Sequence, residues 1–397
     1  MGVWNTTFGR AGSPIDVTGN ATITIFNNNS TSAVPSLSNA ITVQAGKTLT
    51  INGGQRCRVQ GSLSGEGTVK INFPYVRGDF STNLANFEGT LNPTSGQFRI
   101  TTGMNLQKGT FMPGAGVYAA GVQSQSGTET NLISKIGALS STASDAQLGT
   151  GTWNVGYLGT NTTFAGIIGS NATLNKYGEG ALTLTGSSTG KVNVYEGIVS
   201  LENSTATTTA TVTVADGAMV IGTGTSASVT VNKGGTVGAG KALGAILGTL
   251  TLTGNLTVQS GATIRIRGRN RTIDALKVNG RITLNDPIFN MERLNNDWQP
   301  DTDYRIFTGT GTITLTGTPT FEPAIPLEGY LWDYSALVTD GIIRVVADPT
   351  GIEEVEYHKG VESSSEAIYD VLGRKISDSS VLPKGVYIKN GKKYMVR

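Results

Sequence analysis

One short frame of residues recurs four times along this chain. Residues 41–52, 212–221, 229–237 and 256–266 each begin with apolar-Thr-Val-x-x-Gly-x-x-apolar at identical spacing. The alternation of apolar residues with threonine has the period of a β-strand, and the glycine between two such segments is typical of a tight corner. Each unit therefore predicts a strand, a corner and a second strand. A unit this small cannot bury its apolar face alone, so it must stack on neighbouring units.

The rest of the chain supports an all-β structure. Residues 21–26, 47–52, 181–185, 249–253 and 311–316 also alternate threonine with Val, Ile or Leu. Glycine supplies 54 of the 397 residues, and each interior glycine costs a helix about 1 kcal/mol relative to alanine. The glycines lack the strict triplet period of collagen, which excludes a triple helix.

Stacking of such units favours a parallel β-helix over a β-sandwich, which is the alternative built from short alternating strands. At roughly 20–25 residues per coil, residues 1–348 would form on the order of 15 coils. We expect Val212, Val214, Leu250 and Leu252 to point into the column, above equivalent residues one coil away.

Several classes of site are disfavoured by composition. A single Cys57 excludes an intramolecular disulfide, and a single His358 excludes a two-histidine metal site. The net charge of +2 gives no general signal for nucleic acid. No run of 18 apolar residues exists, so we expect no transmembrane helix. We also expect no metal site and no cofactor.

The charge density changes near residue 350. Residues 351–397 hold 15 charged residues among 47, whereas residues 1–350 hold 43 among 350. The sequence Asp348-Pro349-Thr350-Gly351 at this point is good linker and turn chemistry. We therefore predict a β-helical stalk over residues 1–348 and a second, small module over residues 349–397.

Residues 174–186 read Leu-Asn-Lys-Tyr-Gly-Glu-Gly-Ala-Leu-Thr-Leu-Thr-Gly, and Val192-Asn-Val-Tyr-Glu-Gly-Ile-Val-Ser-Leu201 follows them. This stretch resembles the autotransporter-associated β-strand repeat. Residues 274–284, 304–307 and 332–345 are similar, more weakly, to the closing region of the stalks that carry such repeats. The resemblance implies a secreted, right-handed parallel β-helix.

The tail carries three sequence blocks in order: 367–376 with Tyr-Asp-x-x-Gly-Arg, 382–388 with Leu-x-x-Gly-x-Tyr-Ile, and 390–397 with Asn-Gly-Lys-Lys. It resembles a short version of the C-terminal sorting domain of the type IX (Por) secretion system of Bacteroidota. The resemblance implies a β-sandwich-like module, export by the type IX machinery, and a secreted or outer-membrane cell-surface location. The residues matched to the sorting signal are Tyr369, Asp370, Gly373, Arg374, Gly385, Tyr387, Ile388, Gly391, Lys392 and Lys393.

Two further features of the tail bear on this interpretation. Asn390-Gly391 between two alternating segments is typical of a hairpin with a type I′ turn. Type IX cargo also uses an N-terminal Sec signal, and residues 1–7 have neither a basic start nor an apolar stretch. We therefore expect that the beginning of the natural chain is missing.

The strongest candidate binding feature is a row of arginines at every second position: Arg265, Arg267, Arg269 and Arg271. Residues at this spacing share one face of a strand. Guanidinium groups in a row suit carboxylated or sulfated polysaccharide, so we expect weak, salt-sensitive contact with an anionic glycan. The alternative is a solvated strand face whose arginine stems cover apolar neighbours.

Three other patterns are weaker. Asp297, Asp301 and Asp303 offer oxygen ligands for Ca²⁺ but lack the glycine and glutamate of an EF-hand loop, so an ordinary polar loop is favoured. Residues 235–242 nearly match a phosphate-binding loop but end in Ala242, without the metal-binding hydroxyl. Four tryptophans, Trp4, Trp153, Trp298 and Trp332, are either sugar platforms or, more commonly, buried caps of the column.

These observations favour a non-catalytic, surface-exposed stalk of open oligomeric state. The alternative is a polysaccharide lyase or glycoside hydrolase on the same fold, or the ancillary part of one whose catalytic domain lies upstream. A hydrolase needs two carboxylates about 5–10 Å apart, and no Asp-x-Asp or Asp-Asp pair occurs in residues 1–264. A cluster of Asp, Glu, Arg and Lys in one groove would favour the enzyme.

Overall fold

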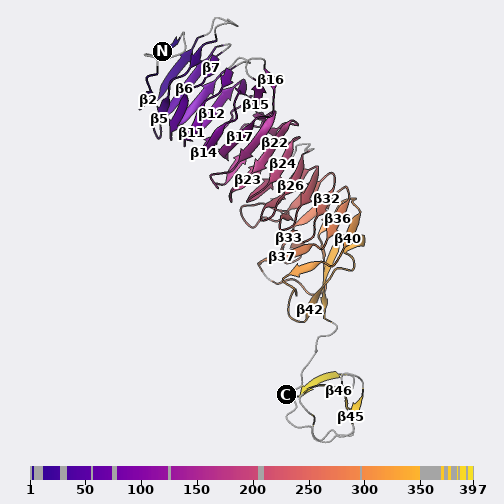
Figure 1. Ribbon diagram of the computed structural model, residues 1–397. Helices are drawn as coiled ribbons and strands as arrows, with labels where there is room; N and C mark the ends of the chain where they lie inside the picture. Colours follow the sequence, from indigo (N-terminus) through magenta and orange to yellow (C-terminus); the bar gives the residue numbers. More distant parts are fainter. Residues whose placement is uncertain are drawn as a thin grey trace.

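The computed structural model describes residues 2–3, 12–26, 34–54, 57–73, 78–123, 127–203, 210–295, 297–348, 368–370, 374–376, 382, 385–389 and 392–396. Residues 12–348 form an elongated column of stacked β-coils, whose colour in Figure 1 changes steadily from one end to the other. The stacked strands of successive coils run parallel. The expected parallel β-helix is therefore confirmed.

One sheet of 15 strands, which we call the long sheet, runs the whole length of the column in the described residues. Its strands in spatial order are β1 (Gly2–Val3), β3 (Ala21–Ile25), β6 (Thr48–Gly53), β9 (Thr68–Asn72), β12 (Thr90–Ser95), β14 (Asn105–Phe111), β17 (Ile133–Leu139), β19 (Gly151–Val155), β22 (Ala172–Lys176), β24 (Lys191–Val194), β26 (Thr211–Val214), β29 (Ser228–Val231), β32 (Leu256–Val258), β36 (Ile282–Asn285) and β40 (Ile313–Thr316).

The other faces of the column change about midway. The N-terminal coils add β4 (Ser36–Leu37), β7 (Cys57–Val59), β10 (Gly78–Phe80), β13 (Gln97–Ile100), β15 (Tyr118–Gln123), β18 (Gln147–Leu148) and β21 (Ile167–Ile168), with β16 (Thr128–Glu129) antiparallel to β15, and a sheet of β2 (Ile15–Val17), β5 (Ile41–Val43), β8 (Ser62–Gly65) and β11 (Asn83–Phe87).

The C-terminal coils use different partners for the long sheet. These are β20 (Thr162–Phe164), β23 (Ala181–Leu184), β25 (Ile198–Leu201), β27 (Met219–Gly222), β30 (Thr236–Gly238), β33 (Thr263–Arg269), β37 (Ile288–Asn295) and β41 (Thr320–Glu322), with β34 (Thr272–Ile273) antiparallel to β33, and a sheet of β28 (Thr225–Ser226), β31 (Thr249–Leu252), β35 (Ala275–Val278) and β39 (Phe307–Thr308).

The core is a narrow apolar column. Val212, Val214, Leu250 and Leu252 are all buried. Val212 is in register with Val229, and Leu250 with Leu276, so each lies over an aliphatic side chain of the next coil. The threonines between them face outward, as the period of two requires. The predicted inward residues are confirmed.

The repeated glycine forms the corner that its spacing predicts. Gly46, Gly217, Gly234 and Gly261 have φ of 69°, 71°, 75° and 74°. In each corner the N–H after the glycine donates to the carbonyl oxygen three residues earlier, at 2.9–3.2 Å. A turn whose third residue needs positive φ selects glycine there.

Three of the four repeat units stack as consecutive coils, and the first does not belong to that set. Residues 212–221, 229–237 and 256–266 each join the long sheet to the β27–β30–β33 face, whereas residues 41–52 join β5 to β6 at another corner. Coil length also varies more than expected. Register partners are 17 residues apart at Val212 and Val229, and 31 apart at Ile282 and Ile313.

The C-terminal end of the column is closed by aromatic side chains and a small antiparallel sheet. This sheet contains β38 (Thr302–Arg305), β43 (Ile342–Ala347) and β42 (Tyr330–Asp333), and a short helix α1 (Leu337–Asp340) precedes β43. Trp298 packs edge-on against Tyr304 and Trp332, at centroid distances of 4.9 and 5.4 Å. These rings cover the last apolar coil.

The described residues of the tail form one four-stranded antiparallel sheet of β44 (Ile368–Asp370), β45 (Lys375–Ile376), β46 (Gly385–Lys389) and β47 (Lys392–Val396). Lys389 pairs with Lys392, so β46 and β47 form the expected hairpin. Ile368 and Tyr387 are its buried residues. Gly373 and Gly391 lie outside the described residues.

Candidate functional site

Arg267 is buried, with 2% of its surface exposed, and it fastens a loop to the column. Its Nε donates to Asp274 Oδ2 at 2.7 Å, and Asp274 is fully buried. Its Nη2 donates to the carbonyl oxygens of Ile246 and Ala239, at 2.8 and 3.1 Å. Its Nη1 donates to the carbonyls of Gly244 and Lys241 at 3.3–3.4 Å. The guanidinium therefore binds the 239–246 loop.

Asp274 completes this lock. Its Oδ1 accepts the N–H of Gly248 at 2.8 Å, and its own N–H donates to the carbonyl of Arg267 at 2.8 Å. Burial raises the pKa of Asp274, and the hydrogen bonds from Arg267 and Gly248 oppose that rise. This pair holds the structure together and presents no charge to a ligand.

Arg265 is also paired. Its Nε donates to Glu292 Oε2 at 2.7 Å, and its Nη2 lies 2.6 Å from the same oxygen. Glu292 comes from β37, the next strand of that face.

Arg269 and Arg271 are exposed and flank Asn270, in the turn between β33 and β34. The expected exposed row of four arginines is therefore wrong as a geometry. The strand alternates as predicted, but a loop covers one arginine, an acid from the next coil pairs another, and the hairpin turn carries the last away from the strand.

The three aspartates of the proposed calcium loop do not converge. Asp297 pairs with Arg293, and Asp303 takes both Nε and Nη2 of Arg344 at 2.7 and 3.3 Å. Asp301 lies in a turn with φ of 48°. Within the described parts of the chain, no group of three or more His, Cys, Asp or Glu is placed to hold a metal ion.

The other two sequence candidates also have structural roles. In residues 235–242 strand β30 is followed by a loop, and Lys241 pairs with Glu202 at 3.1 Å. Trp153, Trp298 and Trp332 are buried, which agrees with capping of the column and leaves no ring for sugar stacking. Trp4 lies outside the described residues.

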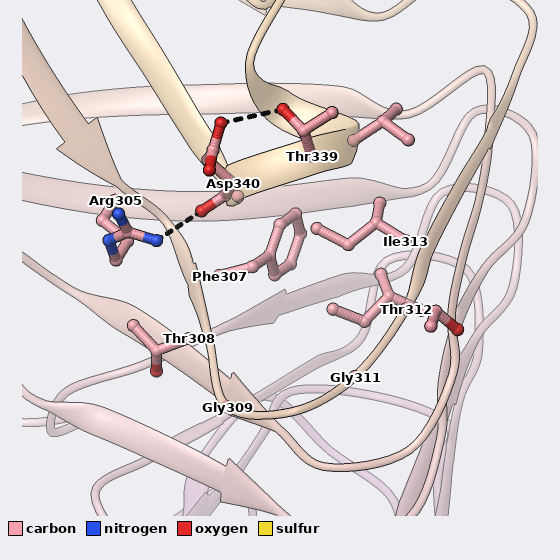
Figure 2. A pocket seen from close by; sticks show the side chains of 12 residues that line it. Arg305, Phe307, Thr308, Gly309, Gly311, Thr312, Ile313, Thr339 and Asp340 are labelled. Carbon is pink, nitrogen blue, oxygen red and sulfur yellow. Dashed lines mark hydrogen bonds between the residues drawn. The ribbon is translucent and has the colours of Figure 1, made fainter.

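A cavity of about 550 Å³ opens beside α1 at the last coil. Figure 2 shows Arg305 and Asp340 on one side and Phe307 and Ile313 on the other. Arg305 donates to the backbone carbonyl of Asp340 at 2.6 Å, and Thr339 donates to its carboxylate at 2.8 Å. Asp340 is the one carboxylate among the lining residues, whereas glycoside hydrolysis uses two.

Sequence reasoning missed two ladders on the long sheet. Asn154, Asn175 and Asn193 are in register on β19, β22 and β24, and each amide nitrogen donates to the previous amide oxygen at 2.8 Å. Tyr157, Tyr177 and Tyr195 follow these strands, with centroid distances of 5.3 and 5.1 Å. We call these six residues the tyrosine face. The missed signal is identical residues separated by one coil length.

The same signal reveals a charged ladder in the N-terminal half. Asp79 is in register with Arg58 on one side and Arg99 on the other. Its carboxylate lies 3.7 Å from Arg58 and 3.1 Å from Arg99. Burial raises the pKa of the nearby Cys57 thiol to about 12, with the charge of Asp79 adding to the rise.

The sorting-signal residues have clear local roles in the tail. The Asp370 carboxylate accepts the backbone N–H of Arg374 at 2.9 Å and its Nε at 2.7 Å, which closes the turn of the Tyr-Asp-x-x-Gly-Arg block. Tyr369 is exposed and Tyr387 is buried. Gly385 and Ile388 lie on β46, and Lys392 and Lys393 begin β47.

Comparison with known proteins adds no relative. No protein-family model matches this sequence, and no curated protein matches it. Among the described residues, no helix is long and apolar enough to cross a membrane.

Proposed function

We propose that this protein is a non-catalytic extracellular stalk, exported by the type IX secretion system and displayed at the cell surface. The observation that carries the proposal is the tail. Its three sequence blocks occur in the order of a sorting domain, and Asp370 and Arg374 of the first block are joined to each other. The parallel β-helix supports a spacing role, because each coil contacts only its neighbours and length grows by addition of coils.

Deletion of residues 351–397 tests export. With a Sec signal added, the full chain should reach the surface of a type IX-competent host, and the truncated chain should stay in the periplasm. Fractionation followed by surface proteolysis measures the distribution. An Asp370→Ala variant should be exported less well, because it loses both hydrogen bonds to Arg374. Surface display of the truncated chain would contradict the proposal.

We also propose that anionic glycan contact, if the stalk makes it, belongs to the β33–β34 turn. Arg269 and Arg271 are the exposed members of the arginine set, whereas Arg265 and Arg267 are paired with acids. Exposed cations bind weakly and are screened by salt.

An Arg269→Gln/Arg271→Gln variant should lose retention on a pectin column at low salt. The matched control is Arg265→Gln, which removes a paired arginine of the same strand and should change retention little. No retention of the wild-type protein at low salt, or equal retention of the double variant, would exclude this contact.

A further inference from the structure

Three successive coils present the same set of side chains outward on the long sheet. The strands β19, β22 and β24 are neighbours in it. Going outward-facing residue by outward-facing residue, the coils read Thr152-Asn154-Tyr157, Thr173-Asn175-Tyr177 and Lys191-Asn193-Tyr195. The tyrosine face is therefore a regular array, one aromatic ring and one amide per coil.

The tyrosine rings leave part of their faces open. Adjacent rings are almost parallel, with interplanar angles of 10° and 14°. Parallel rings in contact are separated by about 3.5–4 Å, so centroid distances of 5.3 and 5.1 Å require the rings to be offset. They overlap like shingles. Tyr157 and Tyr195 are 36% and 43% exposed.

The amides beside the rings keep hydrogen-bonding capacity. An asparagine amide has two N–H donors and an oxygen with two lone pairs. Asn175 uses one donor to Asn154 and accepts one bond from Asn193. The ladder fixes the orientation of each amide and leaves the remaining donor and lone pair for a ligand.

A buried lysine supports the face from inside. Lys176 is 1% exposed, and its Nζ donates to the carbonyls of Tyr177 and Gly178 at 2.7 and 2.6 Å and to that of Glu196 at 3.3 Å. The Glu196 carboxylate accepts the N–H of Gly178 at 2.7 Å. These bonds tie together the coil edges that carry Tyr177 and Tyr195, so the array is already in place without a ligand.

The surroundings are apolar on one side and close to neutral overall. Ile133 and Leu158, from the adjoining coil edges, are 58% and 42% exposed. The tyrosine face itself contains no charged residue, and the nearby Lys191 is opposed by Glu196. Exposed apolar side chains gathered with oriented polar groups mark a binding surface.

We propose that the tyrosine face binds an extended, uncharged β-linked polysaccharide, laid along the column with about one sugar ring per coil. Apolar C–H faces of the sugars pack on the open parts of the tyrosine rings, and their hydroxyls bond to the asparagine amides. The rise per sugar of a β-1,4-linked glucan or xylan is close to the spacing of the rings, so successive sugars meet equivalent groups. The proposal does not depend on how the protein is exported.

The test measures binding to amorphous cellulose and to β-1,4-xylan by pull-down and affinity electrophoresis. The wild-type protein should bind at least one of them equally well at low and high salt, because no charge is involved. Replacing Tyr157, Tyr177 and Tyr195 by alanine should weaken binding about tenfold or more. Salt-insensitive binding also separates this face from the arginine turn, whose contact with pectin should weaken with salt.

Two control variants keep the test decisive. Replacing Thr211, Thr213 and Thr230 by alanine alters the same sheet face one and two coils away and should leave binding unchanged. Replacing the three tyrosines by phenylalanine keeps the rings and should retain most of the binding, even if the alanine variant folds poorly. Absence of wild-type binding to both polysaccharides, or equal binding by a folded alanine variant, would overturn the proposal. Self-association that the alanine variant abolishes, without glycan binding, would instead make this face a protein interface.

Discussion

At the scale of single residues, the fate of a charge in this column depends on what covers it. Arg265 and Arg267 both point outward from β33, yet only Arg267 is enclosed, because the 239–246 loop folds over it. A buried arginine is tolerated when its donors are satisfied. Nε, Nη1 and Nη2 of Arg267 all have acceptors.

Arg267→Gln should therefore be strongly destabilising, by about 3 kcal/mol or more, because it leaves the Asp274 carboxylate buried without its partner. The most direct measurement is limited proteolysis, in which cleavage after Lys241 should accelerate as the loop is released. Arg265→Gln is the matched control, since Glu292 is partly exposed, and it should change cleavage little. Equal cleavage rates in the two variants would show that Arg267 does not hold the loop.

At the scale of the element, the glycine corner is the unit that makes coils possible. The corners of successive coils are joined to one another: the N–H of Gly217 donates to Gly234, and that of Gly234 to Gly261, at 3.1 and 3.0 Å. The next corner uses Asp286 in the left-handed region, with φ of 37°. Backbone shape is therefore the shared requirement, and glycine meets it at least cost.

Gly217→Ala isolates the cost of that backbone shape. A Cβ at Gly217 would meet no atom within 4 Å, so only its φ of 71° opposes the substitution. We expect a loss of about 1–2 kcal/mol, measured as a lower denaturant midpoint of unfolding. Gly19→Ala is the control: its Cβ also meets open space, and its φ is not in the left-handed region. If both variants unfold at the same midpoint, the corner does not require glycine.

At the scale of the whole molecule, a stacked column must close its apolar ends. The described C-terminal end is closed by Trp298, Phe321 and Trp332, and the β38–β43–β42 sheet lies beside them. Repeat architectures need such caps, because the last coil has no further coil to cover it.

Trp332→Ala should consequently open the end of the column. Loss of a buried tryptophan costs about 3–5 kcal/mol, and the exposed coil should increase dye binding and aggregation on mild heating. Tyr334→Ala is the matched control, because Tyr334 is 37% exposed and lies at the edge of the same cluster. A Trp332 variant as soluble as the Tyr334 variant would contradict a capping role.

The tyrosine face shows why ladders are hard to find in a sequence. Asn154, Asn175 and Asn193 are 21 and 18 residues apart, and coil length elsewhere ranges up to 31 residues. A fixed period therefore fails to align residues that the register places side by side. The same variation concealed the contact of Asp79 with Arg58 and Arg99.

The sequence by itself determined the local geometry: which residues face inward, where the chain turns, and that the coils must stack. Alternation and the glycine frame suffice for these, because strand period and positive φ are properties of a few consecutive residues. Only the tertiary structure decided which outward residues stay exposed. That depends on the register of each coil and on the path of loops such as 239–246, so Arg267 became a buried lock while three tyrosines became an open array.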